Sequence, residues 1–117
     1  MILESRSIIF SDEELVLALR PVLESQGKTS NLPLKDVISR LDEEGEVSVT
    51  LVLSDGTDPI KFGHREVGAA VLNHCIDQGV PLPRGSYKEL AIRGDHVALI
   101  VRLESGQFSS GVDEDEE

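Results

Sequence analysis

An internal repeat is the feature of this sequence that most restricts how the chain can fold. Shifting the sequence by 52 residues places IIFSDEELVLAL, residues 8–19, over IKFGHREVGAAV, residues 60–71. Five of the eighteen positions from 10 to 27 are then identical, and they include a Gln-Gly pair at the end of each stretch. The match resumes further on, where residues 47–53 resemble residues 97–103. We interpret this pattern as a tandem duplication.

Each copy predicts the same four elements in the same order. A short apolar run leads directly into a segment with helical spacing, and two strand-like runs follow, separated by turn residues. These segments are residues 5–10, 11–26, 34–41 and 46–54 in the first copy, and residues 58–62, 63–78, 87–93 and 96–103 in the second. The repeating unit is therefore β-α-β-β.

Two such units predict an α+β fold. Repeat A, residues 5–53, and repeat B, residues 59–103, are expected to share one mixed or antiparallel sheet of about six strands, with both helices on one face. Helical spacing and strand alternation together predict the core. Its expected members are Leu15, Leu19, Val49, Leu51, Val67, Ala70, Val71, Leu99 and Val101.

The helix ends carry their own signals. Ser11 followed by Glu14 is a capping-box pattern at the start of the first helix, whereas Gly63 occupies the equivalent place in the second. Gly27 and Gly79 are expected to end the helices. Pro21 lies within the first helical segment, so that a kink or an early end is expected there.

The charge is spread unevenly along a chain whose net charge is −11. Residues 1–60 carry 5 basic and 12 acidic side chains, residues 61–102 carry 6 and 4, and residues 103–117 carry 0 and 6. So acidic a chain repels phosphate backbones, and its three Phe and one Tyr are too few for a base-stacking platform. We therefore expect no nucleic-acid partner.

Length and composition indicate one small domain. We expect residues 1–104 to form a single α+β domain and residues 105–117, which are polar and then acidic, to be a disordered tail. The N-terminus does not resemble a signal peptide, and no apolar run approaches the roughly 20 residues of a membrane span. The expected location is cytoplasmic, with no membrane partner.

Familiar catalytic and cofactor signatures are absent from the sequence. It has no phosphate-binding glycine loop, paired-cysteine metal pattern, His-Glu-x-x-His helix or Gly-x-Ser-x-Gly elbow. His74 and Cys75 are neighbours about 100° apart on a helix, so they are read as a core histidine and a buried apolar residue rather than as metal ligands. We predict no catalytic residue, cofactor or metal, although an enzyme with a shielded His64 or His96 remains an alternative.

The start of the second helix is the candidate binding site. The first helix begins with Ser-Asp-Glu and the second with Gly-His-Arg, and the strand from Tyr87 is expected to return to this end of the second helix. That arrangement would gather five basic side chains beside free helix-start N–H groups, where an anion or an acidic partner could bind. The five are Lys61, His64, Arg65, Arg93 and His96.

Three functional classes remain, and the enzyme described above is the third of them. A non-catalytic protein-interaction or self-association module explains the duplication, the missing catalytic signatures and the split between acidic and basic halves. In that reading the partner is another protein or a second copy of the chain. The alternative is a small-ligand or anion-binding domain that uses the start of the second helix.

Overall fold

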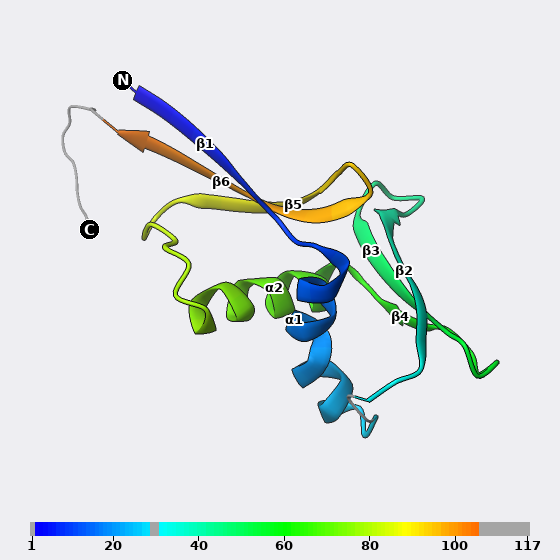
Figure 1. Cartoon of the computed structure of the whole chain (residues 1–117). Helices are drawn as coiled ribbons and strands as arrows, with labels where there is room; N and C mark the ends of the chain where they lie inside the picture. Colours follow the sequence, from blue (N-terminus) through cyan, green and yellow to red (C-terminus); the bar gives the residue numbers. More distant parts are fainter. Residues whose placement is uncertain (1, 29–30, 106–117) are drawn as a thin grey trace.

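The computed structural model describes residues 2–28 and 31–105. Along the chain lie β1 (Ile2–Ile9), α1 (Asp12–Ser25), β2 (Leu34–Leu41), β3 (Val47–Leu53), β4 (Ile60–Phe62), α2 (His64–Asp77), β5 (Tyr87–Arg93) and β6 (His96–Ser105). The protein is α+β, and its two helices and six strands follow the predicted order (Figure 1). That the two halves superpose as duplicated units remains a prediction. The expected tail, apart from Ser105 at the end of β6, lies outside the described residues.

The expected single sheet of about six strands is wrong, because the strands form two antiparallel sheets of three. One sheet has the order β1-β6-β5, and the other has the order β2-β3-β4. The first strand of each half pairs with the last strand of the other half: Ile8 lies opposite Leu99, and Ile60 lies opposite Leu51. Each sheet thus consists of one hairpin and one strand from the other half of the chain. The apolar pattern of a strand does not predict which strand it pairs with, because strand pairing depends on tertiary contacts.

The helix starts use their capping residues in different ways. Oγ of Ser11 accepts the backbone N–H of Glu14 at 3.1 Å, which is one half of the predicted capping box. The other half is absent, because the Glu14 carboxylate contacts His74 on α2 instead. At Gly63 the reverse holds, since Oε1 of Glu66 accepts the Gly63 N–H at 3.1 Å.

The predicted glycines lie two residues beyond the last helical residues, Ser25 and Asp77. Gly27 and Gly79 have φ values of 77° and 72°, which glycine adopts without steric cost. The residue after each glycine donates back into the helix, from Lys28 to the Leu23 carbonyl and from Val80 to the Cys75 carbonyl, both at 2.9 Å. These are Schellman motifs.

Pro21 does not end the first helix early, because α1 continues to Ser25. Proline removes the hydrogen bond that residue 21 would donate to the carbonyl of Leu17. Pro21 is exposed, and Leu17 is 40% exposed, so water can reach this side of the helix. The helix therefore tolerates the missing bond on its solvated side.

The predicted core is confirmed. All nine expected residues are buried, with Leu15, Leu19, Val49, Leu51, Val67 and Val71 fully so. They form one cluster with Phe10, Phe62 and Cys75, and α2 contacts strands of both sheets, β3 and β5. In the part of the chain that the structure describes, neither helix is long and apolar enough to span a membrane.

Candidate partner-binding surface

The two helices cross so that each start lies against the end of the other. Oε2 of Glu14 in the first turn of α1 is 2.7 Å from Nε2 of His74 in the last turn of α2. At the other end, Nε2 of Gln26 is 3.4 Å from Oε2 of Glu66. The start of α2 therefore already has a carboxylate of its own chain, which accepts from Gly63 and faces Gln26. One N–H group at the start of α2 is thus bonded within the chain.

The five predicted site residues come from β4, the start of α2 and the turn between β5 and β6. Lys61 on β4 lies opposite Thr50, and His64 and Arg65 begin α2. Arg93 and His96 flank the turn between β5 and β6 and lie opposite each other.

His96 contacts an acidic residue of the first half. Its Nδ1 lies 3.4 Å from Oδ1 of Asp12, close enough for a charge contact but without hydrogen-bond geometry. Asp12 belongs to the acidic first turn of α1, and Glu14 of the same turn contacts His74. The acidic start of the first helix thus meets histidines of the second half within one chain.

The remaining basic side chains are accessible. Lys61, Arg65 and Arg93 are exposed, and no carboxylate of the described residues forms an ion pair with them. Arg93 Nη1 donates to the neighbouring carbonyl of Ile92 at 3.1 Å. His64 is half-buried beside Gly68 and Leu90, with its Nδ1 inaccessible and unpaired in the described structure. Lys61, Arg65 and Arg93 therefore offer positive charge at the surface.

Three carboxylates gather at the turn between β2 and β3. Oxygen atoms of Asp42, Glu44 and Glu46 lie within 4.8 Å of one another, and all three residues are exposed. Oδ1 of Asp42 accepts the backbone N–H groups of Glu44 and Glu46, both at 2.9 Å. This cluster is therefore explained by the turn that it stabilises.

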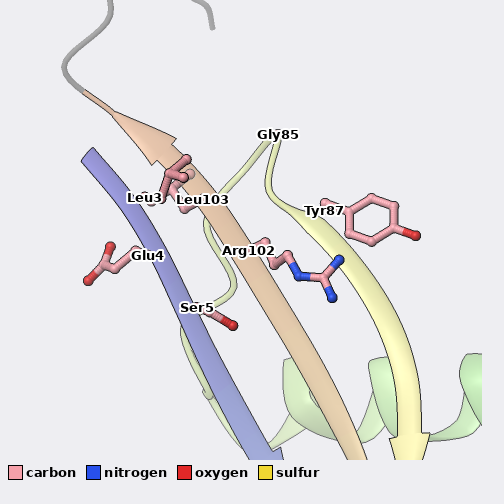
Figure 2. A pocket seen from close by; sticks show the side chains of 7 residues that line it. All are labelled: Leu3, Glu4, Ser5, Gly85, Tyr87, Arg102 and Leu103. Atoms are coloured by element: carbon pink, nitrogen blue, oxygen red, sulfur yellow. The ribbon is translucent and has the colours of Figure 1, made fainter. Parts of the chain in front are cut away.

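An open hollow of about 620 Å³ lies at the far end of the β1-β6-β5 sheet. Figure 2 shows its lining side chains on the three strands and on the loop before β5; the lining residues are Leu3, Glu4, Ser5, Gly85, Tyr87, Arg102 and Leu103. Arg102 forms an ion pair with Glu89 and lies 5.4 Å from the centre of the Tyr87 ring. The arginine is therefore already partnered, although its side chain is 53% exposed.

The outer strands present long free edges. β1 and β2 have eight residues each, and within the described residues β1 pairs only with β6 and β2 only with β3. Leu3 and Ile9 on β1 are 71% and 55% exposed, and β2 exposes Leu34, Ile38 and Leu41. In Figure 1, β1 and β6 run together beyond the helices. The sequence does not reveal which strands form the sheet edges, because strand partners depend on tertiary contacts.

Comparisons with known protein families, with curated proteins and with solved structures found no match to this chain.

Proposed function

We propose that this protein is a protein-interaction module that binds polypeptides along the free edges of its sheets. The observation that carries this proposal is the pair of eight-residue edge strands, β1 and β2, each of which exposes large apolar side chains and pairs with only one neighbouring strand within the described residues. Unpaired N–H and C=O groups on an edge strand are a template for a strand of another chain. Natural edges are usually protected by prolines, charges or covering loops.

β1 has little protection of this kind. It contains no proline, and its two charged residues, Glu4 and Arg6, have opposite signs. Its apolar residues Leu3 and Ile9 lie on one face of the strand, because successive side chains alternate. A partner strand can therefore gain backbone hydrogen bonds and apolar contacts together.

The exposed basic residues give the partner a preferred charge. Lys61, Arg65 and Arg93 are accessible and not ion-paired within the described residues, so an acidic segment of a partner can approach them. Charges at the rim of an interface mainly set partner choice and association rate. Reversing Arg65 and Arg93 to Glu should weaken a complex more at low salt than at high salt, without unfolding the protein.

Edge-blocking variants test the proposal. Tagged protein is incubated with a lysate of cells that naturally make it, and bound polypeptides, including further copies of the chain, are identified by mass spectrometry. Ser5→Pro blocks β1 and Leu41→Pro blocks β2, whereas Ser5→Ala keeps the backbone N–H and serves as the control. We expect a bound polypeptide to be lost from one proline variant and kept by Ser5→Ala. Retention of every partner by both proline variants would refute binding at the edges.

A further inference from the structure

The free edge of β1 has a defined hydrogen-bonding pattern. The N–H of Phe10 donates to the carbonyl of Val97 at 2.9 Å, directly beyond the pairing of Ile9 with Ala98. In an antiparallel pair, hydrogen-bonded and non-hydrogen-bonded positions alternate. The even-numbered residues of β1 therefore bond to β6, and the N–H and C=O groups of the odd-numbered residues point away from the sheet. These residues are Leu3, Ser5, Ser7 and Ile9.

We infer that β1 of a second copy of this chain pairs with this edge, antiparallel and centred on Ser5. The inference deepens the proposed function and rests on it. A two-fold axis at Ser5 places Ser5 opposite its own copy and Leu3 opposite Ser7 of the second copy, all at outward-pointing positions. The two β1-β6-β5 sheets then become one six-stranded sheet with the two β1 strands at its centre.

The charges of Glu4 and Arg6 favour this pairing register over the registers centred one residue earlier or later. Centring on Ser5 places Glu4 opposite Arg6 of the second copy, and the symmetry repeats this pair on the other side of the axis. Centring one residue earlier would place Glu4 opposite Glu4, and centring one residue later would place Arg6 opposite Arg6. Like charges directly opposite each other are destabilising in sheets, whereas opposite charges are stabilising. Of these three registers, only pairing about Ser5 satisfies both side chains.

The geometry around Arg6 is compatible with this pair. Nη2 of Arg6 donates to the carbonyl of Pro81 at 2.8 Å, which holds the side chain on the face of the sheet that also carries Val101. A guanidinium group has five N–H donors, so the others stay available to a carboxylate. Glu4 and Arg6 also fall at non-hydrogen-bonded positions of the new pair, where opposing side chains approach most closely.

Apolar contacts occur on the opposite face of the paired strands. Leu3 and Ile9 lie on that face and are 71% and 55% exposed. In the register centred on Ser5, Leu3 is diagonal to Ile9 of the second copy, and long side chains reach across such a diagonal. The two diagonal contacts cover four exposed side chains. A foreign strand would need a matching sequence to do the same, whereas a second copy supplies it by symmetry.

The mass of the full-length protein in solution tests the inference. Sedimentation equilibrium is measured from about 1 µM to about 1 mM, which spans weak association. We expect a monomer–dimer equilibrium whose dissociation constant rises at least about tenfold in Ser5→Pro, because proline removes a central donor at the two-fold axis. Ser5→Ala should match the parent. Thermal melting shows whether each variant is folded.

Charge variants test the register independently of proline. In Glu4→Arg and in Arg6→Glu, like charges meet at both sides of the axis, so each variant alone should dimerise more weakly than the parent at low salt. Mixing the two variants places an arginine opposite a glutamate at all four positions, so the mixture should form a heterodimer of near-parental stability. A mixture that associates no better than its components would refute the register.

The outcomes separate this inference from the proposed function. A parent that stays monomeric up to the highest concentration, or a dimer that Ser5→Pro does not weaken, would overturn the β1 pairing. If that monomer still loses a different polypeptide partner through Ser5→Pro or Leu41→Pro, the proposed function stands. If neither proline variant loses a bound polypeptide, both the β1 pairing and the proposed function are refuted.

Discussion

Oε2 of Glu14 and Nε2 of His74 lie 2.7 Å apart and join the first turn of α1 to the last turn of α2. The His74 side chain is only 13% exposed, and its ring lies 6.5 Å from that of Phe10. Glu14 thereby leaves the capping position that its spacing from Ser11 predicted. A contact between the two halves of the chain has replaced a contact within one helix start.

This relationship predicts a measurable coupling between the two residues. Glu14→Ala should lower the free energy of unfolding by about 1 kcal/mol. A charge-assisted hydrogen bond contributes more than this when both partners are buried and less when both are exposed, and here only His74 is largely buried. Glu13→Ala is the matched control, because Glu13 is an exposed acid in the same first turn. In a double-mutant cycle with His74→Ala, the coupling should reach about 0.5 kcal/mol or more. Additive single effects would contradict a direct contact.

Leu19 provides a test of the packing of the core. Its side chain is fully buried among residues of both halves, so Leu19→Ala should lower the free energy of unfolding by about 2 to 5 kcal/mol. Leu17→Ala on the same helix removes the same atoms from a side chain that is 40% exposed, and should cost less than about 1 kcal/mol. Urea melts of both variants provide the comparison. Equal costs would show that the helix packs with a different face.

The local elements could be predicted from the sequence, and their partners could not. Strands β2 and β5 begin and end where the apolar runs do, and the helices end two residues before Gly27 and Gly79. The boundaries of strands and helices depend on residues that are close in the sequence, so they can be predicted from the sequence alone. The pairing of β1 with β6 depends on contacts between residues that are 89 to 103 positions apart in the sequence, so the expectation of one sheet failed.

The candidate site shows the same division. The sequence correctly placed His64 at the start of α2 and His96 at the start of β6. It did not predict that His96 would lie beside Asp12, or that Glu66 would accept the Gly63 N–H. Charge counting by segment treats the halves as separate surfaces, whereas folding brings the acidic start of α1 to the histidines of the second half.

The turn between β5 and β6 provides a test of backbone conformation. Arg93 pairs with His96 across a two-residue turn, in which Gly94 and Asp95 have φ values of 55° and 65°. Positive φ at both positions is typical of a type I′ hairpin turn. Asp95→Val should destabilise the protein by about 1 to 2 kcal/mol, because a side chain branched at Cβ is strained there. Asp95→Asn should be close to neutral in the same denaturant melts, and a matching loss in both variants would indicate a role for the carboxylate.

Cys75 reports on opening of the core. It is the one cysteine of the sequence, it is 1% exposed, and burial raises the pKa of its thiol. A raised pKa means that the thiol stays protonated at neutral pH, and only the thiolate reacts quickly with disulfide reagents. Labelling of the folded protein with Ellman's reagent at neutral pH should therefore be slow, and denaturant should make it fast.

The same labelling separates local access to Cys75 from unfolding of the core. Cys75 and Leu19 belong to one buried cluster, so a reagent that reaches Cys75 only after global opening should react faster in Leu19→Ala. When closing is faster than labelling, the rate follows the open population, and each 1.4 kcal/mol of lost stability gives about a tenfold increase. Leu17→Ala should change the rate far less. An unchanged rate in a Leu19→Ala protein that melts at lower urea would mean that Cys75 is reached through a local opening of the α2 end alone.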